Sequence, residues 1–158
     1  MIGLPTEQPD DLQGVVDLTR KAAALFCRRG SGRELRVSIN TFVPKPWTPF
    51  QWAGMATERE IRAKRRSVLE PLNRIEGVSV GRKSGREEVL QALFSIGTVE
   101  VGEALVRAVQ EKREWQGIYG EFAGWVHRSK VPEETLPWDF IDNGLEKGRL
   151  LRGWGEAK

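Results

Sequence analysis

Apolar residues recur at helical spacing early in the chain and then give way to strict alternation. The recurring positions are Leu12, Val15, Val16, Thr19, Ala22, Ala23 and Phe26. Their spacing predicts a helix with one buried face, which begins at Pro9 and ends at the glycines of 30–32. Alternating residues 35–40 predict a strand, and Ile2-Gly3-Leu4-Pro5 predicts a shorter one before the helix. Together these segments predict a βαβ unit with parallel strands, either part of a larger sheet or a small complete α/β domain.

The next segment, residues 42–52, is rich in proline and aromatic residues. Its three prolines are incompatible with a regular helix and with a central strand. We expect an ordered, extended loop that carries four aromatic rings.

From residue 56 onward the pattern is mainly helical. Thr57-Glu58-Arg59-Glu60 and Ser84-Gly85-Arg86-Glu87 are capping boxes that each predict a helix start. A short strand is expected at 78–81, and further helices after Thr98, around residues 119–126 and from Glu146 to Trp154. We therefore predict two parts, a βαβ part at residues 1–55 and a mainly helical extension at residues 56–158.

The composition excludes several kinds of chemical site but does not identify a function. The 158 residues include 25 basic and 22 acidic side chains, largely interspersed, for a net charge of +3. That mixture is typical of a solvated surface, so nucleic-acid binding is not expected from charge alone. The cationic side chains at 62–66 are interpreted as a solvated helix face in preference to an anion-binding site. Cys27 and His127 are single, so they cannot supply a zinc site or an iron–sulfur cluster. One cysteine and the lack of a signal peptide or a long apolar run lead us to expect a cytoplasmic protein.

Three segments resemble one enzyme family, in the order in which that family carries them. Met1-Ile2-Gly3-Leu4-Pro5-Thr6-Glu7 resembles the fifth-strand motif of radical S-adenosylmethionine (SAM) enzymes. Phe42-Val43-Pro44-Lys45-Pro46-Trp47-Thr48-Pro49-Phe50 resembles their sixth-strand and loop segment. Leu136-Pro137-Trp138-Asp139 with Ile141-Asp142 resembles the C-terminal signature of a subgroup of uncharacterised Fe-S oxidoreductases, which often carry an N-terminal B12-binding domain. Gln8 and Phe140 depart from the family, where Thr and His respectively are common.

The resemblance implies an α/β fold: the last two strands of a partial (β/α)6 TIM-like barrel, followed by a mainly helical C-terminal region. It also implies SAM and a [4Fe-4S] cluster as cofactors of the parent enzyme, with cobalamin as a further candidate. The cluster would bind a Cys-x-x-x-Cys-x-x-Cys loop, which this sequence lacks. We therefore expect a fragment that is inactive alone, binds no cofactor alone and has the missing N-terminal half as its partner. An exposed sheet edge would also favour a homo-oligomer.

The resemblance further implies roles for individual residues. Ile2, Gly3, Glu7, Val43 and Pro44 would line SAM, while Lys45 and Trp47 would face the substrate. Each residue also has a structural interpretation. Gly3 would shape a turn, Glu7 would stabilise the helix start, and the loop aromatics would clamp their own loop.

Other residues read as structural. Asp139 and Asp142 suggest turn and cap roles, His127 a contact with helix-terminal carbonyls, and Cys27 a core thiol. We assign no catalytic or metal-binding residue. The alternative function is a helical accessory or interaction module, without catalytic activity, that touches RNA through its basic helix and aromatic residues.

Overall fold

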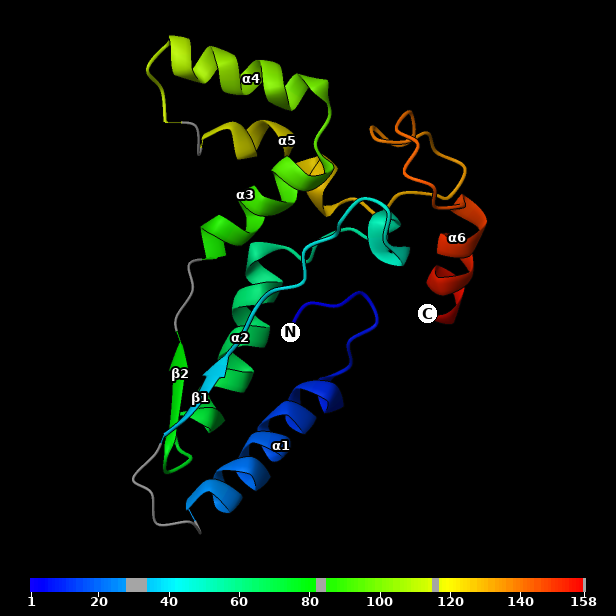
Figure 1. Cartoon of the computed structure of the whole chain (residues 1–158). Helices are drawn as coiled ribbons and strands as arrows, with labels where there is room; N and C mark the ends of the chain where they lie inside the picture. Colours follow the sequence, from blue (N-terminus) through cyan, green and yellow to red (C-terminus); the bar gives the residue numbers. More distant parts are fainter. Residues whose placement is uncertain (28–33, 82–84, 115–116, 158) are drawn as a thin grey trace. The chain divides into compact units, whose positions relative to one another are not determined.

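The computed structural model describes residues 1–27, 34–81, 85–114 and 117–157 (Figure 1). The chain divides into two compact units, each built from two stretches of sequence. Unit 1 comprises Met1–Phe42 and Ala56–Gly85, and unit 2 comprises Val43–Met55 and Arg86–Lys158. The division at residue 55 that the sequence suggests stays a prediction, since compactness groups the chain in a different, interleaved way.

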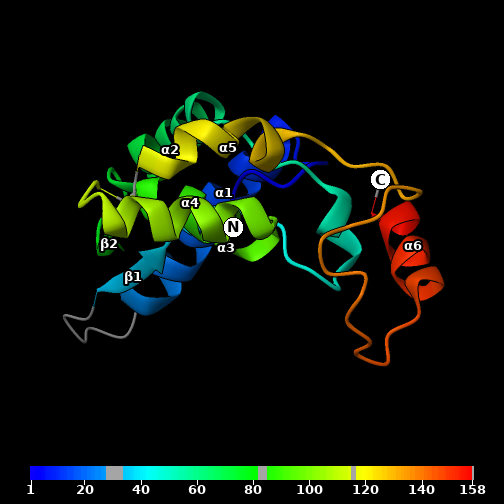
Figure 2. The same cartoon turned by 90° about the horizontal axis from the view of Figure 1, so that it is seen from above.

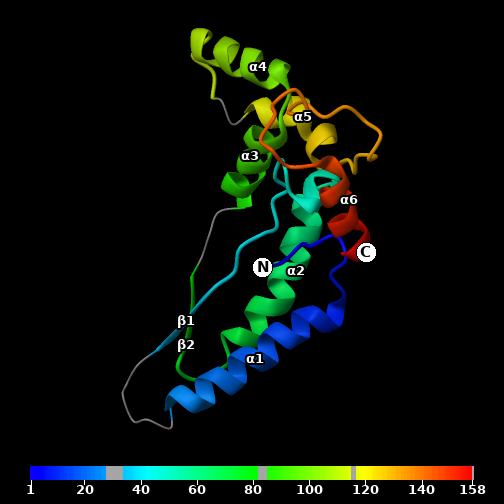
Figure 3. The same cartoon turned by 45° about the vertical axis from the view of Figure 1, so that its right-hand side comes forward.

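Unit 1 is a helix pair with a two-stranded sheet. Helix α1 (Pro9–Cys27) packs against α2 (Glu58–Leu72), and the two helices lie side by side in Figures 1 and 3. Strands β1 (Leu35–Ser38) and β2 (Val78–Gly81) pair in parallel, with Leu35 opposite Val78. Because α2 connects the two strands, this is a βαβ unit, which lies later in the chain than the one predicted.

Local sequence explains where these helices begin. Helix α1 starts at Pro9, as predicted, and the Gln8 amide donates to Asp11 Oδ2 at 2.8 Å. The capping box before α2 is confirmed: Thr57 Oγ1 accepts from the Glu60 amide, and the Glu60 carboxylate accepts from the Thr57 amide. These reciprocal bonds satisfy amides that have no partner within the helix.

Unit 2 contains the remaining helices and an aromatic-rich core. It comprises the 3-10 helix η1 (Pro49–Trp52), α3 (Gly85–Ile96), α4 (Val99–Gln110), α5 (Ile118–His127) and α6 (Lys147–Glu156). Helix α4 packs against α5, as Figure 2 shows from above, and α6 packs against η1. Its buried cluster holds Trp52, Ile96, Leu136, Trp138 and Leu150, and further tryptophans pack against it.

The prediction of a TIM-like barrel fragment is wrong. In the described ranges the only sheet has two strands of four residues each, beside six α-helices. The fold is therefore a mainly helical small structure that is only loosely α/β. The apolar alternation at 35–39 does form a strand, but alternation in one strand carries no information about how many others join it.

Two local predictions also need correction. The first strand is reduced to an isolated parallel bridge between Ile2 and Thr41. The proline-rich loop is not extended throughout, because Pro49 begins the 3-10 helix η1. The predicted capping box at 84–87 involves Ser84, which lies outside the described residues. In the part of the chain that the structure describes, no helix has both the length and the apolar character to cross a membrane.

Candidate functional site

The predicted SAM-lining residues Ile2, Gly3 and Glu7 form a tightly bonded turn in unit 1. The Ile2 amide donates to the Asn40 carbonyl at 2.9 Å, and its side chain is only 1% exposed. Gly3 has a φ of +82°, in the left-handed region where glycine is preferred. Its amide donates to Glu7 Oε2 at 2.9 Å.

The Glu7 carboxylate is held from a second direction by helix α2. Lys64 Nζ lies 2.7 Å from Glu7 Oε1, and the Glu7 side chain is 3% exposed. The next residue of α2, Arg65, donates to Thr41 Oγ1 at 3.0 Å. In unit 1, therefore, the side chains of Ile2 and Glu7 are engaged within the fold, and Gly3 itself is buried.

The other predicted residues, Val43, Pro44, Lys45 and Trp47, belong to unit 2. Pro44 is buried and Val43 is half-buried. The Lys45 ammonium donates to Ser95 Oγ on α3, and burial lowers the pKa of Lys45. Lys45 is thus bonded to a neutral hydroxyl on a helix of its own unit.

Trp47 is the predicted substrate residue with the most distinctive geometry. Its φ of +53° places a bulky residue in the left-handed region, a strain that proteins retain where the surroundings impose it. The Trp47 amide donates to Gln51 Oε1 at 3.0 Å, and the Trp138 indole donates to the same oxygen at 2.8 Å. Gln51 is 2% exposed, so this shared acceptor lies inside the unit. Gln51 Oε1 thereby connects the segment that resembles the sixth-strand loop with the segment that resembles the C-terminal signature.

The same two segments line a groove of about 360 Å³. Its lining combines apolar and polar side chains, namely Trp47, Gln51, Asp139, Phe140, Ile141, Asp142, Asn143, Leu145, Lys147 and Leu150. Phe140 is 84% exposed, an unusual setting for an aromatic side chain. Such a combination of exposed apolar surface and a few polar groups is typical of binding sites.

The turn and cap roles of Asp139 and Asp142 are confirmed. Asp139 Oδ2 accepts from the Leu136 amide at 3.0 Å and lies 3.4 Å from Lys147 Nζ. Asp142 Oδ1 accepts from the Gly144 amide at 2.9 Å. Both carboxylates shape the groove wall, and the two are not arranged as a proton-transfer pair.

Sequence reasoning missed two polar clusters at the end of α5. Lys130 is 4% exposed, and its ammonium donates to the carbonyls of Trp125 and Arg128 and lies over the Trp125 ring. Burial, and then the neighbouring Arg128, lower the pKa of Lys130 to about 8. A lone lysine in a polar stretch gives no signal of this burial.

The other cluster corrects the prediction for His127. Its Nδ1 donates to the Met55 carbonyl at 2.8 Å, and its Nε2 lies 2.5 Å from Tyr119 Oη. A neutral ring with its proton on Nδ1 accepts the phenol proton at Nε2. His127 thus ties α5 to the segment before α2, and Lys130 contacts the helix-terminal carbonyls instead. The side chain of Cys27, the predicted core thiol, lies outside the described part.

The residues do not fit an iron–sulfur cluster. Such a cluster needs three or four thiolates, and the whole sequence has one cysteine. Among the described residues, no three His, Cys, Asp or Glu side chains gather where they could hold a metal ion.

Comparison with known proteins gives a distant likeness. No family model matches the chain, and no solved structure matches it. The chain is similar to the uncharacterized protein MJ0966 of Methanocaldococcus jannaschii, with 26% identity over 98 residues. The match covers 61% of this chain but only 20% of the archaeal protein, so the similar region is about a fifth of that relative's length.

Proposed function

We propose that this chain is the C-terminal part of a radical SAM Fe-S oxidoreductase and supplies a substrate-side groove and part of the SAM rim. The observation that carries the proposal is the side-chain oxygen Oε1 of Gln51, which accepts from both the Trp47 amide and the Trp138 indole. Two segments that resemble one family, about ninety residues apart in sequence, thereby meet on one buried atom and line one groove. A chance resemblance gives no reason for the two segments to meet.

Each predicted residue then has a defined task in this proposal. Gly3 shapes the turn beside the cofactor, because glycine adopts the positive φ of this position without the strain that a side chain would add. Ile2 and Glu7 are positioning residues that hold this turn. Trp47 lines the groove and is the substrate contact that we favour. Val43 and Pro44 shape the start of the loop, and Lys45 anchors it to Ser95.

The electron that cleaves SAM comes from a [4Fe-4S] cluster when that cluster is bound in such enzymes. This chain lacks the thiolates for it, so we assign the cluster to another polypeptide segment and derive no chemical step from these residues. The chain alone is then inactive, and its partner is the cluster-binding part. We also propose a cytoplasmic location, because a single cysteine favours a reducing compartment.

The genomic locus tests this proposal. We expect the coding sequence in frame with or next to this one to encode a Cys-x-x-x-Cys-x-x-Cys loop. An isolated gene with no such loop in its neighbourhood contradicts the proposal. Calorimetric titration of SAM into this chain alone is a second test: we expect weak or no binding, and a low-micromolar dissociation constant would show that the chain holds SAM without a cluster.

A further inference from the structure

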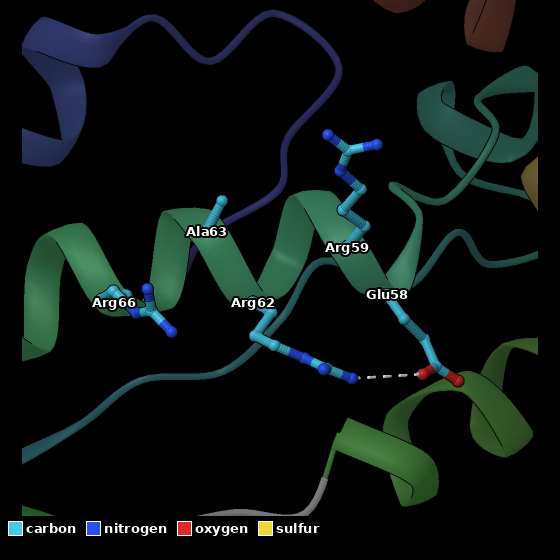
Figure 4. Close-up of a pocket in the computed structure, with 5 residues that line it drawn as sticks. All are labelled: Glu58, Arg59, Arg62, Ala63 and Arg66. Carbon is cyan, nitrogen blue, oxygen red and sulfur yellow. Dashed lines mark ion pairs between the residues drawn. The ribbon is translucent and has the colours of Figure 1, made fainter.

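Helix α2 sorts its cations onto two faces. Lys64 and Arg65 are half-buried and held by Glu7 and Thr41, which fixes the rotation of the helix. Arg59, Arg62 and Arg66 are exposed and line a groove of about 420 Å³ together with Glu58 and Ala63. Figure 4 shows the three arginines on successive turns of α2, with Arg62 directed toward Glu58 and Arg59 directed away from it. The cationic side chains of α2 therefore lie on two different faces of the helix, although they follow one another closely in sequence.

The groove has an excess of positive charge with little to neutralise it. Its one acidic side chain, Glu58, lies 3.8 Å from Arg62, and these two side chains are 47% and 76% exposed. So exposed a pair contributes little and gives way readily to a competing anion. Within the described residues, neither Arg59 nor Arg66 forms an ion pair.

The spacing of the arginines indicates the shape of the ligand. Residues 59, 62 and 66 lie along one stripe, and the first and last are about 10 Å apart along the helix axis at 1.5 Å per residue. A row of this length suits successive phosphates better than a single one. Guanidinium groups bind phosphate oxygens in a bidentate manner.

The groove also lacks what base recognition needs. Its lining contains no aromatic side chain for stacking and no Asn or Gln for pairing with base edges. We propose that the Arg59–Arg62–Arg66 groove binds the phosphodiester backbone of a single-stranded nucleic acid without sequence preference. This inference goes beyond the proposed function and does not depend on it, because neither SAM nor a cluster contributes to the groove.

Fluorescence anisotropy with a labelled oligouridylate of about twelve nucleotides tests the proposal. We expect the logarithm of the affinity to fall with the logarithm of salt concentration with a slope of about −2, since each of three contacts contributes about 0.7 for a single strand. The triple variant R59Q/R62Q/R66Q should bind at least tenfold more weakly, with a slope near zero. An oligothymidylate DNA of the same length should bind similarly, because the backbone is the ligand.

A matched control separates this site from overall charge. The variant R20Q/R113Q/R149Q also removes three exposed arginines and likewise lowers the net charge from +3 to 0. It should bind within about twofold of the unaltered protein. Equal weakening by both triple variants, or no weakening by the groove variant, overturns the proposal. So does the absence of measurable oligouridylate binding, or full competition by inorganic phosphate at an equal concentration of phosphate groups.

One further variant guards against an effect of misfolding. E58Q removes the only carboxylate of the groove, so it should tighten oligouridylate binding several-fold. A gain in affinity cannot arise from loss of structure. Unchanged or weaker binding by E58Q contradicts the electrostatic role of this groove.

Discussion

Burial of Lys130 should make the stability of unit 2 depend on pH in an unusual window. Replacing this residue with methionine keeps the length and apolar stem of the side chain but removes the charge. In the native chain the ammonium has two carbonyl acceptors, both at 3.3 Å, and lies 4.6 Å from the centre of the Trp125 ring. These contacts compensate the loss of hydration only in part, so the pKa of Lys130 falls to about 8.

The sign and size of the effect follow from proton linkage. An unfolded chain holds the Lys130 proton up to about pH 10.4, whereas the folded chain releases it near pH 8. Between these values the unfolded state binds more protons, so the free energy of unfolding rises with pH. As pH rises from about 7 to about 10, we expect the free energy of unfolding of the native chain to increase by about 2 kcal/mol relative to that of K130M. This value includes a reduction for residual solvent screening.

Urea denaturation followed by tryptophan fluorescence measures this difference. The native chain, K130M and the control K21M, an exposed lysine on α1, are each unfolded near both pH values. We expect the native chain and K21M to gain stability relative to K130M as pH rises. Parallel pH profiles for all three proteins would refute the reasoning, because they would show that the Lys130 ammonium is as well solvated in the folded chain as in the unfolded one.

Two further predictions concern tight backbone sites and helix starts. G54A should lower the free energy of unfolding by about 3 kcal/mol, because a Cβ there would collide with the His127 carbonyl. The control G120A, in α5 with open space around it, should instead raise stability by about 0.5 kcal/mol, and equal effects of the two would contradict the packing. T57A should cost about 1 kcal/mol by removing the acceptor for the Glu60 amide, measured as a lower urea midpoint. An unchanged midpoint would show that the capping box does not stabilise α2.

Local features of the fold were predictable because they depend on neighbouring residues. Pro9 and the Thr57 capping box mark helix starts through bonds within one turn, and both are found as expected. The number of strands in the sheet was not predictable in the same way. Two short apolar alternations satisfy a two-stranded sheet as well as a larger one, and the Ile2 segment forms only a bridge.

The candidate site was only partly predictable, because side-chain contacts at long range leave no local signal. Trp47 was expected to face a ligand, but its meeting with Trp138 through Gln51 depends on tertiary packing. Lys130 and Arg62 look alike in sequence, yet one is buried and the other lines an open groove. Burial of a charged residue is decided by the elements that pack around it.

The most direct test of the proposed function is production of 5′-deoxyadenosine from SAM by the assembled protein. The chain is co-expressed with the cluster-binding polypeptide from its own locus, and the complex is reconstituted anaerobically with iron and sulfide and reduced. Our account predicts 5′-deoxyadenosine from the complex, none from either part alone, and a lower rate with W47A. Formation of 5′-deoxyadenosine by the cluster-binding part at the same rate without this chain would contradict it.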